Sequence, residues 1–178
     1  MKGVFSKEGE AFTNSMNLIA SLLVRYPGIA TVSLDPEQKS LGFTFVVARP
    51  LSRPEFRRFM ATVKENLGAV ANLLGQSPAL LEVNLSHHEG MSFIEVKRDI
   101  ATLAPEEISL LTALLDQEFG GALVREQDEA LEEEDKAFQE EMIERMLEDL
   151  KDSRQERKLI GFREDGRVMV FNRATVQK

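Results

Sequence analysis

Residues 81–97, with the sequence LEVNLSHHEGMSFIEVK, largely alternate apolar and polar side chains on both sides of the dipeptide Glu89-Gly90. Such alternation is typical of strands with one buried face, and a two-residue loop that ends in glycine is typical of a tight hairpin. The facing pairs are then Leu85 with Ile94, Val83 with Val96, and Glu82 with Lys97. Because apolar pairs and an opposite-charge pair fall into register together, this stretch predicts a β-hairpin.

The segments on both sides of this hairpin have apolar residues at helical spacing. Upstream, Ser52 and Glu55 have the spacing of a capping box, and Pro54 suits a first helical turn. Downstream, a second helix follows Pro105 and ends at the glycine pair 120–121. The predicted buried stripes are Phe56, Met60, Val63, Leu67, Val70 and Leu74 in the first helix, and Ile108, Leu111, Leu115 and Phe119 in the second.

The same order of elements precedes this unit. Residues 7–26 have a helical periodicity that stops at Pro27, and two alternating segments follow around the polar turn 35–40. A shift of 51 residues aligns Pro27 with Pro78, and six of the nineteen positions in residues 17–35 are then identical. We therefore predict a duplicated α-β-β unit, closed by the helix after Pro105. The competing interpretation is coincidence among common residues such as leucine and alanine.

The net charge of −8 comes from one segment, because residues 126–156 hold fourteen acidic and four basic side chains. Residues 126–155 contain no glycine or proline, which favours a helix. Its second half carries an apolar stripe made of Phe138, Met142, Ile143, Met146, Leu147 and Leu150. Thirty helical residues span ~45 Å, whereas a domain of this size has a radius of gyration of ~16 Å. We expect this helix to bend, to cross the domain or to project, and a projecting helix with an apolar half needs a partner.

A second tight hairpin is predicted at Asp165-Gly166, since both residues of a type I′ turn need positive φ angles. The facing pairs are then Phe162 with Met169 and Ile160 with Phe171, which gives one apolar face. An isolated hairpin is marginal in water. We therefore expect this one either to extend the main sheet or to pack on a second subunit.

Together these elements predict an α+β fold. Two α-β-β repeats would form a mainly antiparallel four-stranded sheet backed by helices on one face, with the long acidic helix and the C-terminal β-hairpin appended. The predicted division is a duplicated core domain over residues 1–125, an acidic helical arm over residues 126–156 and the hairpin over residues 157–178.

The chain offers few residues for catalysis or metal binding. It has no cysteine, which excludes disulfides and thiolate metal sites. His87-His88-Glu89 is the only place where both histidines meet a carboxylate, but adjacent strand side chains point to opposite faces, which favours a polar hairpin tip over a metal site. No phosphate-binding loop or nucleophile motif occurs. We predict no catalytic residue, metal or cofactor, and the sequence favours a non-enzyme without excluding a site assembled from distant carboxylates.

One neighbourhood is basic, and it consists of Arg49, Arg53, Arg57, Arg58 and Lys64, with Lys97 and Arg98 as additional candidates. On a helical wheel Arg53, Arg57 and Lys64 share a flank, which would suit a phosphate ligand or a nucleic acid. The absence of tryptophan and the core spacing of the phenylalanines argue against a stacking platform for bases. The alternative is that these cations are solvated or pair with the acidic helix.

These observations favour a non-catalytic interaction or regulatory protein, a homodimer that associates through the helix-hairpin arm of residues 126–172, while another protein partner stays open. The partner-binding candidates are Phe138, Met142, Ile143, Met146, Leu147, Leu150, Ile160, Phe162, Met169 and Phe171. The alternative hypothesis is a module that binds nucleic acid or a phosphate ligand through the stripe from Arg49 to Lys64, with the acidic helix autoinhibitory. The apolar run 18–24 is too short to span a bilayer, so we expect no membrane contact and a cytoplasmic location.

Overall fold

The hairpin predicted around Glu89-Gly90 forms with the predicted register, with Leu85 opposite Ile94. Both loop residues have positive φ angles, 51° for Glu89 and 77° for Gly90, as a type I′ turn requires. These observations come from a computed structural model, which describes residues 2–125, 133–154 and 156–173.

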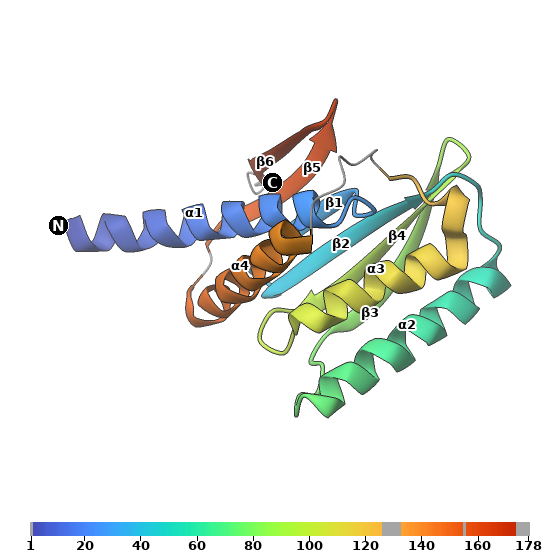
Figure 1. The fold of residues 1–178 in the computed structure, drawn as a ribbon, viewed down its shortest axis with the longest axis horizontal. Helices are drawn as coiled ribbons and strands as arrows, with labels where there is room; N and C mark the ends of the chain where they lie inside the picture. Colours follow the sequence, from blue (N-terminus) through green and yellow to red (C-terminus); the bar gives the residue numbers. More distant parts are fainter. Residues whose placement is uncertain (1, 126–132, 155, 174–178) are drawn as a thin grey trace.

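Within those residues the chain forms four α-helices, a short 3₁₀ helix and six strands (Figure 1). Their bounds are α1 Lys2–Arg25, β1 Thr31–Asp35, β2 Ser40–Val47, α2 Arg53–Leu73, β3 Leu81–His88, β4 Met91–Asp99, α3 Pro105–Phe119, η1 Gly120–Ala122, α4 Glu133–Asp152, β5 Lys158–Glu164 and β6 Arg167–Arg173. The order confirms an α+β chain in which two α-β-β segments are followed by a helix, and the duplication itself stays a prediction.

The strands form one antiparallel sheet in the order β3-β4-β2-β1-β5-β6. The predicted count of four strands was wrong, because the C-terminal hairpin joins the same sheet when β5 pairs with β1. Thr31 lies opposite Phe162 and Ser33 opposite Ile160 in that pairing. Of the two arrangements expected for the hairpin, the structure has the first: the hairpin extends the main sheet. The two edge strands of that sheet are therefore β3 and β6.

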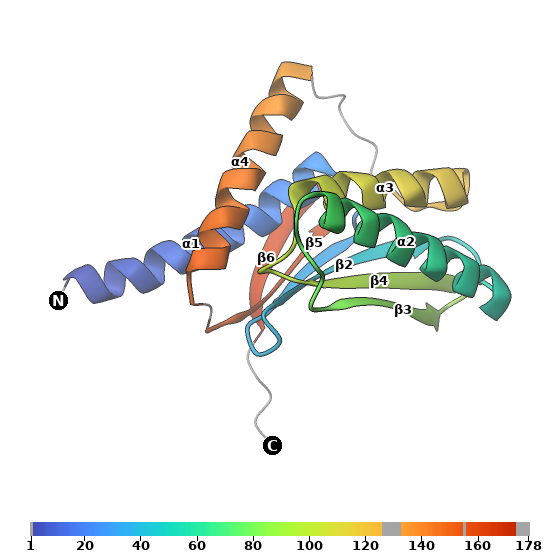
Figure 2. The ribbon, with the colours of Figure 1, turned by 90° about the horizontal axis from the view of Figure 1, so that it is seen from below.

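The four described helices lie on one face of the sheet, and none of them lies on the opposite face (Figures 1 and 2). The core lies between the two layers and includes Phe43, Phe45, Val96 and Leu115, each at most 1% exposed. The predicted stripe of α3 is fully buried. This helix is apolar on two flanks because it occupies the middle of the helical layer, between α2 and the pair α1–α4 (Figure 1).

The predicted stripe of α2 was correct only in part. Its buried residues are Phe59, Val63, Leu67 and Ala71. Phe56, Met60 and Val70 are half-buried beside them, and Leu74 at the helix end is 49% exposed. The true stripe is rotated toward α3, where the Phe59 ring contacts Phe119 with 4.9 Å between the centroids.

The long acidic helix does not project along its whole length. Its described part, α4, packs against α1 and contacts α3 (Figure 2). The first predicted turns, residues 126–132, lie outside the described residues. None of the described helices has the length and apolar composition needed to cross a bilayer.

Candidate protein-interaction surface

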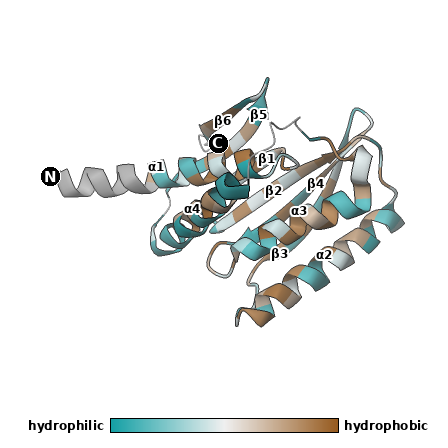
Figure 3. Cartoon of the chain, in the orientation of Figure 1, coloured by the Kyte–Doolittle hydropathy of each residue, from teal (hydrophilic) through white to brown (hydrophobic). Residues whose placement is uncertain are grey.

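The β5–β6 hairpin presents an apolar surface on the helix-free face of the sheet. The predicted register is confirmed, with Phe162 opposite Met169 and Ile160 opposite Phe171. The Phe162 and Phe171 rings stack with 5.6 Å between their centroids, and Phe171 is 46% exposed. We call these four side chains the hairpin patch. Figure 3 shows the apolar colouring of much of β6 at the border of the molecule.

The orientation of this hairpin is determined by its other face, which packs under α1. Gly161 faces that helix, and a Cβ atom built there would lie 2.2 Å from Cγ2 of Ile19 and 3.1 Å from Cδ1 of Leu23. Only glycine allows β5 to approach α1 so closely. Since side chains alternate along a strand, Ile160 and Phe162 must then point to the helix-free face.

Hydrogen bonds from Arg163 link the same hairpin to the C-terminal end of α1 and the residues that follow it. Its guanidinium donates hydrogen bonds to the backbone carbonyls of Leu23, Tyr26, Pro27 and Ile29, at 2.8 Å for Pro27 and 3.3 Å for Tyr26. Carbonyls at the C-terminus of a helix lack intrahelical donors and carry partial negative charge, so a cation is favourable there. The hairpin is therefore fixed on one side and open on the other.

The outer edge of β6 is also open in the described chain, because β6 ends the sheet. The residues that flank a two-residue loop form a hydrogen-bonded pair, and bonded pairs alternate along an antiparallel ladder. From the loop at Asp165-Gly166, the backbone groups of Val168, Val170 and Asn172 then point away from β5. An edge strand of this kind is a template for another strand.

The structure divides the helix residues predicted to bind a partner into two groups. Ile143, Met146, Leu147 and Leu150 are each at most 8% exposed and belong to the core of this chain. Phe138 and Met142 are 62% and 40% exposed. An ion pair between Arg25 of α1 and Glu140 of α4 holds the two helices together, with 3.1 Å between Nε and Oε1.

The predicted basic stripe is also divided. Arg49 forms a two-pronged ion pair with Glu55, at 2.9 Å and 2.6 Å, and hydrogen bonding to Arg49 lowers the pKa of Glu55. Arg58 follows Arg57 directly in α2, so its side chain is rotated about 100° from that of Arg57 around the helix axis. Arg53, Arg57 and Lys64 are exposed along one flank, so they form the compact part of the stripe.

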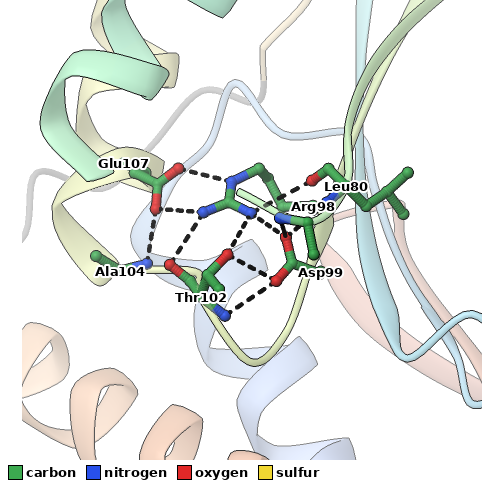
Figure 4. Close-up of polar contacts among 7 residues, drawn as sticks. Leu80, Arg98, Asp99, Thr102, Ala104 and Glu107 are labelled. Carbon is green, nitrogen blue, oxygen red and sulfur yellow. Dashed lines mark hydrogen bonds and ion pairs between the residues drawn. The ribbon is translucent and has the colours of Figure 1, made fainter. Parts of the chain in front are cut away.

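The inclusion of Arg98 in the basic neighbourhood was wrong, because it is 1% exposed inside an ion-pair cluster (Figure 4). Its Nε and Nη2 atoms donate to the two carboxylate oxygens of Glu107 at 2.7 Å and 2.9 Å. Its Nη1 atom bonds Asp99 and the Thr102 hydroxyl. Lys97 lies on the other face of β4, 3.9 Å from Glu95.

The arrangement offers little for chemistry. His87 and His88 end β3 on opposite faces and both are exposed, and no group of three or more potential metal ligands occurs in the described residues. A pocket of about 200 Å³ at the C-terminal end of α1 is lined by Arg25, Tyr26 and Asp116, among other residues. Burial raises the pKa of Tyr26, although its hydroxyl is 2.8 Å from the Ser109 hydroxyl.

Comparison with known proteins adds no functional assignment. Neither the known family models, nor the curated proteins, nor the solved structures contain a match to this chain.

The hairpin patch was predicted from sequence, since loop length and alternation determine it. The open edge of β6 was missed because it depends on the position of the hairpin in the sheet. The burial of the α4 stripe was missed because its covering surface, α1, lies more than 100 residues earlier in the chain.

Proposed function

We propose that this chain is a non-catalytic interaction protein that forms a homodimer through the β5–β6 hairpin. The observation that supports it is the hairpin patch, four adjacent apolar side chains on a face that carries no helix (Figure 2). Phe171 is exposed and the other three side chains are half-buried, and a contiguous apolar cluster at the surface is typical of an interaction site. The proposal keeps the hairpin part of the predicted arm and leaves out the four α4 residues that this chain buries itself.

A second copy of the chain is the occupant that the edge geometry favours. The outward residues Val168, Val170 and Asn172 are centred on Val170, so two β6 strands related by a two-fold axis can pair antiparallel. In that register Met169 of one copy faces Phe171 of the other on the helix-free side. Pairing would join two six-stranded sheets and bring both hairpin patches together. An isologous contact of this kind closes after two copies.

Val170→Pro tests the pairing, because it removes the outward N–H and leaves the ladder to β5 intact. Proline is tolerated on edge strands at positions whose N–H faces solvent. Val170→Thr is the matched control, since it keeps the N–H and the β-branched shape. We expect light scattering at micromolar concentration to show a dimer for the wild type and for Val170→Thr, and a monomer for Val170→Pro.

A second pair of variants separates the hairpin from the helix. Phe171→Ser should weaken dimerisation by at least about tenfold, whereas Phe138→Ser should leave it within about twofold although Phe138 is the more exposed ring. Circular dichroism would verify that each variant is folded. A monomeric wild type would refute the dimer, and the reverse order of the two phenylalanine effects would assign the contact to α4 instead.

A further inference from the structure

We propose that the outer edge of β3, together with the basic flank of α2, binds an extended acidic peptide by strand addition. This site lies at the opposite edge of the sheet from the hairpin, so it does not depend on the proposed homodimer.

The outer edge of β3 carries unpaired backbone groups. The loop Glu89-Gly90 makes His88 and Met91 a bonded pair, so the alternate residues of β3 direct their N–H and C=O groups outward. These outward residues are Leu81, Val83, Leu85 and His87. The strand has eight residues and contains no proline or lysine, two common protections of an exposed edge.

The basic flank of α2 lies over this edge. Arg53, Arg57 and Lys64 are separated by four and seven residues and therefore share one flank. The neighbouring helix α3 contacts the other flank, where the ring of Phe59 packs on Phe119. Because α2 is the last helix of the layer and contacts β3, its basic flank faces the side where the sheet ends (Figures 1 and 2).

Among the described residues, these three cations have no carboxylate partner. Across the described residues, no acidic side chain lies within ion-pair distance of Arg53, Arg57 or Lys64, and all three are exposed. The described acidic helix α4 does not form ion pairs with them, since it packs on α1 at the far side of α3 from α2 (Figure 1). Unneutralised positive charge beside a strand edge favours an acidic partner.

The side chains between the edge and the cations suit a peptide. Phe56 and Met60 of α2 and Leu81 and Leu85 of β3 are only half-buried against the core. A strand added to β3 would direct alternate side chains toward them, as in β-augmentation, where main-chain bonds give affinity and alternate side chains give specificity. The edge alternates donors and acceptors, which matches a peptide backbone, whereas nucleic-acid phosphates accept hydrogen bonds only.

Fluorescence anisotropy with a labelled heptapeptide of alternating valine and glutamate tests the proposal on the full chain. One register of such a peptide directs its glutamates to α2. We expect saturable binding that weakens with added salt, and no saturable binding of the matched valine-lysine peptide. N-methylation of one of the two alternate sets of peptide amides should abolish binding, because those amides pair with β3.

Charge reversal locates the site without disturbing the core. Arg57→Glu should weaken peptide binding at least about tenfold, and Arg58→Glu, the same change about 100° further around the helix and away from the basic flank, should weaken it less than about threefold. Neither variant should alter the oligomeric state, so failure here is distinguishable from failure of the hairpin dimer. Equal effects of the two reversals, insensitivity to both N-methylated sets, or binding of an oligonucleotide but of neither peptide would each overturn the proposal.

Discussion

Arg98 is the largest fully buried side chain of the described residues, and its charge is neutralised by Asp99 and Glu107. The cluster joins the end of β4 to the first turn of α3, where Glu107 also accepts a hydrogen bond from the Ala104 N–H at 2.8 Å (Figure 4). Buried ion pairs contribute little net stability, but loss of one partner leaves an uncompensated charge. Arg98 therefore makes this corner depend on its carboxylates.

Glu107→Ala should destabilise the chain by at least about 2 kcal/mol, measured as the free energy of unfolding in urea. The reason is that Nε and Nη2 of Arg98 and the Ala104 N–H would lose their buried acceptor, although Asp99 still neutralises the guanidinium. Glu106→Ala is the control, since Glu106 is exposed one residue away and should change the same quantity by less than about 0.5 kcal/mol. Similar effects of the two substitutions would contradict this account of the cluster.

The other carboxylate of the cluster makes stability depend on pH. Burial by itself raises the pKa of Asp99, but hydrogen bonds from Thr102 and Leu80 and the charge of Arg98 outweigh it, so the pKa falls below 3.8. A depressed folded-state pKa contributes stability that is present above the unfolded value and is lost as the pH falls through the folded value.

The unfolding free energy of the wild type should therefore exceed that of Asp99→Asn at neutral pH, and the difference should shrink below about pH 4. Urea titrations of both proteins across that range measure it. Glu106→Gln, which removes an exposed carboxylate, provides the baseline for general acid effects. A difference that is constant with pH would mean that the Asp99 charge contributes nothing.

At the scale of elements, the contact between β5 and α1 depends on Gly161. A methyl group at this position would overlap Ile19, whose β-branched side chain is 1% exposed and has little freedom to move. Overpacking of a core typically costs about 1–3 kcal/mol. The hairpin would have to separate from α1 to relieve the overlap.

Gly161→Ala should lower the free energy of unfolding by about 1–3 kcal/mol, and the same change at Gly121, where no atom lies within 4 Å of the added carbon, should have a much smaller effect. Urea denaturation compares the two. The double variant Gly161→Ala with Ile19→Ala should lose less than the sum of the single variants, because the clashing methyl is gone. Strict additivity would show that the two residues do not interact.

Elements and registers were predictable wherever a short loop determined them. Both two-residue loops gave the residue pairs of their hairpins correctly, because a slip by one residue would turn every side chain to the other face. The addition of the hairpin to the main sheet was expected only as one of two alternatives, because alternation and loop length predict its apolar face and do not show what covers that face. The buried stripe of α2 was predicted with the wrong rotation about the helix axis. Helical spacing shows which positions are apolar, but the helix that covers them, α3, lies elsewhere in the sequence, so the spacing does not show which of them are buried.

The candidate site follows the same division. The hairpin patch depends on alternation and one turn, and the sequence was sufficient to name all four residues. Burial of the α4 stripe depends on its contact with α1, which is distant in the sequence. Burial of Arg98 depends on its pairing with Glu107, and no local sequence pattern distinguishes a cation on the surface from one in a buried ion pair. The β3 edge was missed because an edge strand is defined only by the strand order of the whole sheet.

At the scale of the molecule, the asymmetry of the layers is the dominant feature. All helices of the described residues cover one side, so this part of the chain leaves one face and two edges of the sheet for contacts with other molecules (Figure 2). The hairpin patch and the β3 edge lie at opposite ends of that sheet. If both proposals hold, a dimer built through β6 would present its two β3 edges at its outer limits, and each would bind a peptide independently.

The pairing of β1 with β5 also has a consequence for synthesis. The two strands are separated by about 125 residues, so at 5–20 residues per second β1 emerges about 6 to 25 s before its second neighbour exists. Throughout that interval β1 lacks its second neighbour and α1 lacks Arg163, and for most of it α1 also lacks α4. Completion of the sheet is therefore tied to the synthesis of residues 158–173, and a ribosome that stalls before the hairpin leaves a chain whose sheet ends at β1 instead of β6.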